Sequence, residues 1–165
     1  MISRLSDADL AAQIAEGAGQ ILLGVRHGDL LTGRHLGDVG DAMAQAWIAN
    51  VIVRHRPHDA VLSEEGADIG DRAATDRVWI IDPLDGTTNF IHGIPQFAIS
   101  IALKVRGQLE VGVIINPVSK EEFTAAKGRG AQMNGRRMRA SKEAKLEGAL
   151  LSTGFPFRPD QAKFL

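Results

Sequence analysis

The sequence predicts an α+β fold in which two N-terminal helices pack on a largely antiparallel sheet. Helical spacing of apolar residues dominates the first third of the chain, and strict alternation follows from residue 97 onwards. Helices followed by a run of antiparallel strands are typical of an α+β layer pair. Composition agrees, because 165 residues with 44% hydrophobic and 24% charged side chains suit about one globular domain.

The first helix is predicted to begin after Ser6, a good N-cap residue that Asp9 follows three positions later. Apolar residues then recur on one helical stripe, and Gly17 and Gly19 within it indicate close packing against a neighbour. The glycine-rich residues 28–40 predict a loop.

A second helix is predicted over residues 41–56, with Trp47 among its inward side chains and Pro57 ending it. Two short apolar runs follow, at residues 60–62 and 78–81, and each stops at acidic residues. Buried strands that deliver carboxylates at their ends build rigid sites.

The alternating residues 97–105 and 109–115 predict a β-hairpin around the turn Arg106-Gly107. Asn134-Gly135 is a strong signal for another two-residue hairpin turn. Residues 149–154 look like the opening strand of a further structural unit.

Composition and charge exclude several classes of function. The absence of cysteine excludes disulfides, cysteine-based zinc sites and thiol nucleophiles. A net charge of -1 argues against bulk nucleic-acid binding. The start of the chain lacks the apolar core of a signal peptide, and no run reaches membrane-spanning length, so we expect a cytoplasmic protein without a membrane partner.

The acidic residues are the strongest chemical signal. Asp82 and Asp85 are three positions apart on a predicted turn, and Glu64, Glu65 and Asp41 complete a set without a lysine or arginine cluster. Carboxylates packed this closely repel one another unless a cation lies between them, and hard oxygen ligands favour Mg²⁺ or Mn²⁺ over zinc. For Asp41 and the glutamates alone, a helix cap and a solvated strand end are the alternative interpretations.

Gly86 and Thr87 add backbone amides and a hydroxyl next to these carboxylates. If a helix or tight turn begins there, its amides form a phosphate site. Metal ligands beside an anion cradle indicate phosphoryl chemistry, in which metals neutralise the phosphate and activate water.

The segment Asp82-Pro-Leu-Asp-Gly-Thr87, with Ser63-Glu-Glu-Gly66 and Asp41 upstream, resembles the inositol monophosphatase family of Mg²⁺-dependent, lithium-sensitive phosphatases. The resemblance implies a phosphoric monoester hydrolase that uses direct attack by water, without a phosphoenzyme. It implies an inositol phosphate or a 3'-phosphonucleotide as the substrate.

The resemblance implies a role for each residue that matches the family's motif. Glu64, Asp82 and the main-chain carbonyl of Leu84 would bind the first metal, and Asp82 and Asp85 would bind the second. Thr87, oriented by Asp41, would polarise the attacking water, with Glu64 counted among the catalytic residues. The amides of Gly86 and Thr87 would hold the phosphate, and Glu65 would act mainly in the outer shell.

The chain lacks the family's second signature, Trp-Asp-x-Ala-Ala/Gly-Gly, whose aspartate supplies a further ligand to the second metal. We therefore expect residues 1–147 to form the metal-binding domain, residues 148–165 to begin a truncated second domain, and activity to be impaired. The part up to about residue 87 looks closer to the branch that cleaves 3'-phosphoadenosine 5'-phosphate. The remainder looks like the bacterial inositol monophosphatase branch, so a hybrid is a hypothesis.

Two alternatives to a phosphatase stay open. The chain could be a non-catalytic, truncated or chimeric folding unit that retains the metal-binding turn. It could also be an interaction module that uses the basic residues of segment 127–145, although a solvated charged hairpin is the interpretation we favour. A sheet edge and an apolar face left bare favour self-association into a homodimer.

Overall fold

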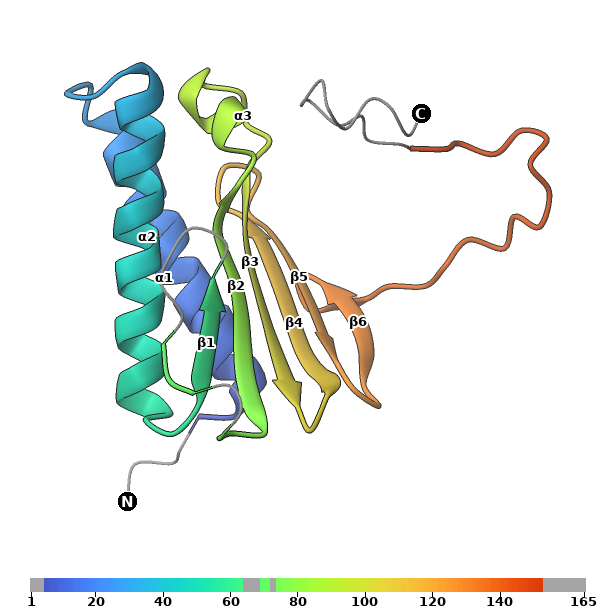
Figure 1. Cartoon of the computed structure of the whole chain (residues 1–165). Coiled ribbons are helices and arrows are strands. Elements are labelled where there is room, and N and C mark those ends of the chain that lie inside the picture. Colours follow the sequence, from blue (N-terminus) through green and yellow to red (C-terminus); the bar gives the residue numbers. More distant parts are fainter. Residues whose placement is uncertain (1–4, 64–68, 72–73, 153–165) are drawn as a thin grey trace, which may run out of the picture.

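The computed structural model describes residues 5–63, 69–71 and 74–152. Helices α1 (Asp7–His27) and α2 (Gly33–His55) lie side by side on one face of a sheet (Figure 1). Helix α1 packs on strands β3 and β4, and helix α2 packs on β2. The predicted α+β architecture is confirmed.

The sheet has seven strands in sequence order, and only β1 and β2 run parallel among the described pairs. A short helix, α3 (Thr87–Ile91), separates β2 from β3. No helix in the described ranges combines the length and the apolar character that a bilayer crossing needs. The strands are β1 (Ala60–Ser63), β2 (Arg77–Asp85), β3 (Ala98–Val105), β4 (Gln108–Asn116), β5 (Glu121–Ala126), β6 (Gly130–Met133) and β7 (Arg136–Arg137).

The start and the packing of α1 follow the prediction. The hydroxyl oxygen of Ser6 accepts a hydrogen bond from the Asp9 amide at 3.1 Å, so Ser6 is the N-cap. A Cβ added to Gly17 would lie 2.6 Å from Nε1 of Trp47, and one added to Gly19 would lie 3.0 Å from Cβ of Pro117. Both glycines therefore permit contacts that a larger residue would block.

The loop predicted over residues 28–40 is wrong in its second half, because α2 begins at Gly33 rather than at residue 41. Two of the glycines there, Gly37 and Gly40, serve helix packing. A Cβ on Gly37 would lie 2.9 Å from Cδ1 of Ile91, and a Cβ on Gly40 would lie 3.0 Å from Cε1 of Phe90. Glycine composition alone does not distinguish a loop from a close helix contact.

The inward placement predicted for Trp47 is also wrong, since this residue is 41% exposed. Its indole lies across α1 and donates a hydrogen bond to the carbonyl of Ile14 at 3.2 Å. The core between helices and sheet is built instead from aliphatic residues of α1 and α2, together with Trp79, Phe90 and Phe97.

Both predicted hairpin turns are confirmed. Arg106 and Gly107 have φ values of 50° and 78°, and Asn134 and Gly135 have φ values of 48° and 75°, as type I′ turns require. Residues 149–152 form no strand, contrary to the prediction, and residues 153 and 154 lie outside the described residues. The predicted strand would have no neighbour with which to pair there.

A group of ion pairs fixes the lower end of β2 in Figure 1. The Arg77 guanidinium donates to Asp59 at 2.9 Å and to Asp7 at 3.0 Å, and Arg56 contacts Asp7 at 2.8 Å. The Trp79 indole donates to Asp59 at 2.8 Å. These contacts join the first turn of α1 and the segment between α2 and β1 to the start of β2.

Partial burial raises the pKa of Asp7, but the hydrogen bonds and charges of Arg77 and Arg56 outweigh it, so this pKa lies below its usual value. A depressed pKa in the folded state means that the ionised carboxylate stabilises the fold above its unfolded pKa. That contribution is lost as the pH falls through the folded pKa.

We therefore expect Asp7→Asn to lower the free energy of unfolding at pH 7 by about 1 kcal/mol, a value reduced by the solvent exposure of the group. The difference from the wild type should shrink as the pH falls below about 4. Urea titrations at several pH values measure both. Asp29→Asn, in the exposed turn after α1, is the control; a difference for Asp7→Asn that stays constant with pH would contradict the assignment.

Candidate active site

The acidic end of β2 lies at the opposite end of the strand from the ion pairs. Asp82 pairs with Ser100 of β3, and the register shifts between Asp82 and Asp85, which marks a bulge. The expected turn over residues 82–85 is therefore an irregular strand end, and the chain turns at Gly86. Bulges of this kind redirect side chains at sites.

Two hydrogen bonds fix this strand end. The Leu84 amide donates to Oδ1 of Asp82 at 3.1 Å, and the Thr87 hydroxyl donates to the Leu84 carbonyl at 3.0 Å. Leu84 is 3% exposed, so its side chain anchors the bulge in the core. The structure thus brings together Asp82, Leu84 and Thr87, three of the residues that the sequence predicted.

Gly86 connects the strand end to α3 in a conformation that favours glycine. Its φ is +88°, and an added Cβ would lie 2.9 Å from the carbonyl oxygen of Gln96. Both the left-handed backbone and the close approach exclude a larger residue. Helix α3 begins at Thr87, so the helix start proposed at this position is confirmed.

Asp41 and Thr87 line the same groove, which has a volume of about 540 Å³ and lies between α2 and α3. Asp41 is half-buried in the third turn of α2, so the alternative role of a helix cap is wrong. Asp85 is exposed at the end of β2 and does not line this groove.

The remaining predicted ligands, Glu64 and Glu65, lie outside the described residues. The position just before them is fixed, because the Ser63 hydroxyl donates to Oε1 of Gln45 at 2.6 Å. Gln45 also lines the groove, one turn after Asp41 on α2. The sequence analysis missed Gln45, whose only signal was its position four residues after Asp41.

Helix α3 is held in place by contacts of residues that the sequence analysis did not assign to the site. Phe90 contacts Phe97 edge to face, with 5.1 Å between ring centroids, and the Arg26 guanidinium lies 5.0 Å from the centre of the Phe97 ring. The Asn89 side chain donates to the Gln96 carbonyl at 2.6 Å. The contact of Arg26 joins segments that are far apart in the chain, so no local sequence pattern reveals it.

The described donors are of the kind that a magnesium ion prefers. The Asp82 carboxylate and the Leu84 carbonyl are hard oxygen ligands at one strand end. Among the residues that the structure covers, no three acidic or histidine side chains gather as a metal cluster. The donor chemistry therefore fits Mg²⁺, and a full ligand set requires residues beyond those described.

The fold is that of a known protein family. A sequence model of the inositol monophosphatase family matches residues 5–163, and the chain belongs to this family. The predicted family resemblance is confirmed.

Among curated proteins, the chain is similar to the Nus factor SuhB of Pseudomonas aeruginosa, with 54% identity over 122 residues. It is also 45% identical over 121 residues to the Nus factor SuhB of Escherichia coli. Each alignment covers 73% of this chain and 45% of the relative. The aligned region therefore spans less than half the length of these relatives.

Solved structures support the same family assignment. The extragenic suppressor protein suhB from Bartonella henselae matches with a TM-score of 0.81 and 39% identity, covering 94% of this chain and 61% of that one. The inositol monophosphatase from Anabaena matches with a TM-score of 0.73 and 36% identity, covering 84% of this chain and 50% of the other.

The packing of α2 on α3 can be tested at Gly37. We expect Gly37→Ala to be less stable than Gly24→Ala by about 1 to 2 kcal/mol, because the new methyl group would lie 2.9 Å from Cδ1 of Ile91 and 3.0 Å from Cγ2 of Thr87, which offsets the gain that alanine brings to a helix. Gly24→Ala in α1, where nothing lies within 4 Å, should stabilise the protein by up to about 1 kcal/mol. Urea unfolding measures both, and equal shifts in the two variants would contradict the packing argument.

Proposed function

We propose that this chain carries the metal-binding half of a Mg²⁺-dependent phosphomonoesterase of the inositol monophosphatase type. The observation that carries the proposal is the strand end where Asp82, the Leu84 carbonyl and the Thr87 hydroxyl are joined by hydrogen bonds, with the groove containing Asp41 next to it. Family membership and the names of inositol monophosphatase neighbours support the same class of reaction.

Asp82, Leu84 and Glu64 would hold the first metal, and Asp85 would help Asp82 to hold the second. When bound, Mg²⁺ supplies charge neutralisation for the phosphate and a lowered pKa for water. Glu64 would also act among the catalytic residues, and Glu65 would stabilise the ligands from the outer shell.

Thr87 and Asp41 would orient the attacking water, and the amides of Gly86 and Thr87 would hold the phosphate oxygens. The water oxygen forms a bond to phosphorus while the ester P–O bond breaks, and the alcohol leaves with a proton. Asp41 and Thr87 line the same groove, which supports a shared role in orienting the water. No covalent enzyme intermediate is formed in this scheme.

We further propose that residues 1–147 are the metal-binding domain and that residues 148–165 begin a second one. The family's second signature lies outside these 165 residues, so this stretch tested by itself would lack one metal ligand and one wall of the cleft. The 165-residue chain would then turn over slowly, on the order of a thousandfold below a complete site.

The test is phosphate release from inositol 1-phosphate and from 3'-phosphoadenosine 5'-phosphate, with and without Mg²⁺. We expect slow release that requires Mg²⁺ and falls by at least about a hundredfold in Asp82→Asn, because this change removes a charged metal ligand. Mn²⁺ should replace Mg²⁺ in part. The preferred substrate would distinguish the two branches of the family.

Asp76→Asn, an exposed acidic residue just before β2, is the matched control and should leave the rate unchanged. A folded protein that releases no phosphate from either substrate would reject the phosphatase proposal. That result would instead favour the alternative that the chain is a non-catalytic folding unit.

A second candidate function is binding of a polyanion by segment 127–145. The basic side chains of this segment are exposed, and the similar SuhB proteins are named Nus factors. Lys127 is paired with Glu110 at 2.7 Å, so the arginines carry this candidate. The exposed basic residues are Lys127, Arg129, Arg136, Arg137, Arg139, Lys142 and Lys145.

If this segment binds a polyanion, a fluorescent single-stranded RNA should bind weakly at low salt and lose affinity steeply as salt rises. Replacing Arg136, Arg137 and Arg139 by glutamine should remove this binding, whereas Arg54→Gln on α2 should not. Equal binding by both variants would show a non-specific charge effect and reject the segment as the site.

A further inference from the structure

Two aromatic side chains in the region of helix α3 contact one positive charge. The Arg26 guanidinium, in the last turn of α1, lies over the Phe97 ring at 5.0 Å and over the Phe90 ring at 6.0 Å. The two rings contact each other edge to face. One cation therefore contacts both members of an aromatic pair, at distances where its attraction to the ring faces is significant.

The rings are the main partners of this guanidinium at its buried end. Within residues 5–63, 69–71 and 74–152, no acceptor bonds to the buried Nη1 atom of Arg26. A desolvated donor without a hydrogen bond destabilises a protein, and attraction to two aromatic faces offsets part of that cost. The rings therefore fix the position of the charge, and by the same attraction the charge fixes the position of the rings.

Phe90 connects this charge to helix α3. The helix has five residues, too few to be stable without tertiary contacts. All five are described, and Phe90 alone among them is buried. Its ring packs against α2, because a Cβ added to Gly40 would lie 3.0 Å from Cε1 of Phe90. Contacts at Phe90 therefore determine where α3 lies.

Phe97 connects the same charge to the beginning of α3. A Cβ added to Gly86, the N-cap residue of α3, would lie 3.3 Å from Cα of Phe97. The Gly86 carbonyl accepts a hydrogen bond from the Phe90 amide at 3.0 Å. The first turn of α3 is thus fixed at both ends, by Gly86 and by Phe90, and Thr87 lies between them.

We propose that Arg26 is a positioning residue for the strand-end site, an inference that rests on the proposed function. By holding Phe90 and Phe97, its guanidinium keeps the first turn of α3 in place. The Thr87 hydroxyl then stays in the groove that contains Asp41. Arg26 does not line this groove and acts only through the two rings.

The test is residue-resolved amide hydrogen exchange, measured by NMR on the full 165-residue chain. Arg26→Met keeps an unbranched side chain and removes the charge. The amides of Phe90 and His92, which donate to carbonyls of Gly86 and Thr88, should then exchange about tenfold faster. The amides of the paired strands β3 and β4 should keep their protection, whereas a general loss of stability would speed exchange in both regions.

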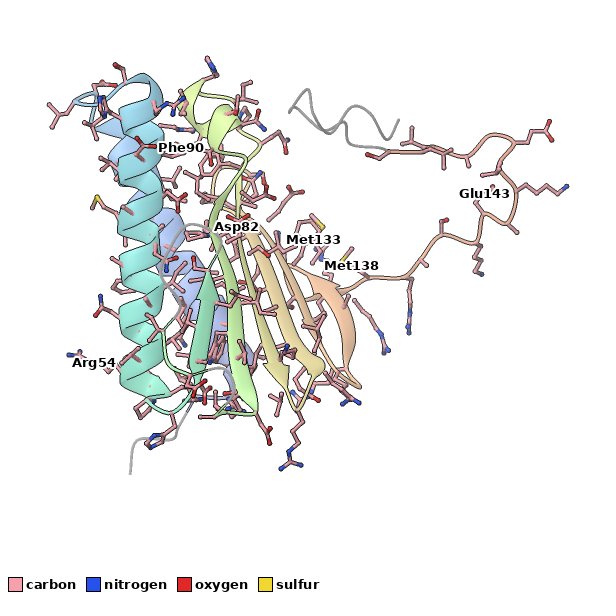
Figure 2. The ribbon with its side chains drawn as sticks, in the orientation of Figure 1. Arg54, Asp82, Phe90, Met133, Met138 and Glu143 are labelled. Atoms are coloured by element: carbon pink, nitrogen blue, oxygen red, sulfur yellow. The ribbon has the colours of Figure 1, made fainter. Side chains whose placement is uncertain are left out.

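Arg54→Met is the matched control. Arg54 is an exposed arginine near the end of α2 that lies far from Phe90, as Figure 2 shows, and its replacement should leave exchange in α3 unchanged. Phe97→Leu removes one aromatic face, so in that background Arg26→Met should speed exchange at Phe90 by less than about threefold. Equal acceleration in both backgrounds would overturn the proposal, and so would exchange at the wild-type rate in Arg26→Met.

Kinetics on the same variants separate this inference from the proposed function. With a phosphate ester that the wild type hydrolyses, Arg26→Met should lower kcat about tenfold and change KM less than about twofold. Thr87 would no longer orient the water, whereas Gly86 keeps its own contact with Gln96. An unchanged kcat would overturn the positioning role. A wild type without turnover would reject the proposed function, and the exchange rates would still decide whether Arg26 holds α3.

Discussion

The position of strand β2 depends on the Arg77 guanidinium, which joins two carboxylates from different parts of the chain. Asp59 precedes β1 and Asp7 opens α1, so this one cation links the edge of the sheet to the helical layer. Removing one partner would leave the remaining charges partly desolvated, which costs more than the pair itself contributes. Once its first residue is fixed, β2 runs through the core and delivers Asp82 at a defined place.

The other end of β2 is determined by close packing instead of charge. Gly86 turns the backbone where no other residue fits, and Gly37 allows α2 to approach α3. These two contacts bring Thr87 into the groove that also contains Asp41. The geometry of the site therefore combines a rigid strand with a close helix–helix contact. Neither alone would place the side chains of Asp82, Thr87 and Asp41.

The order of the elements and most of the site residues could be predicted from the sequence, because period, turn residues and the acidic motif are local signals. Gly37 and Gly40 could not be assigned, because glycine serves both a loop and a close helix contact. Trp47 was misplaced for a related reason: its partner, Gly17, lies in another helix. Gln45 acts through a hydrogen bond from Ser63, a residue in another element that only the fold brings near.

The alternation of β2 connects the site to the face of the sheet opposite α1 and α2. Trp79 and Ile81 point into the core beneath the helices, so Ile80 and Asp82 belong to the opposite face. The carboxylate predicted to bind metal thus lies at the border of an apolar surface. Whatever covers that surface also determines how much water reaches Asp82, and electrostatic interactions there strengthen as water is excluded. The two faces of this one strand therefore join the core to the site.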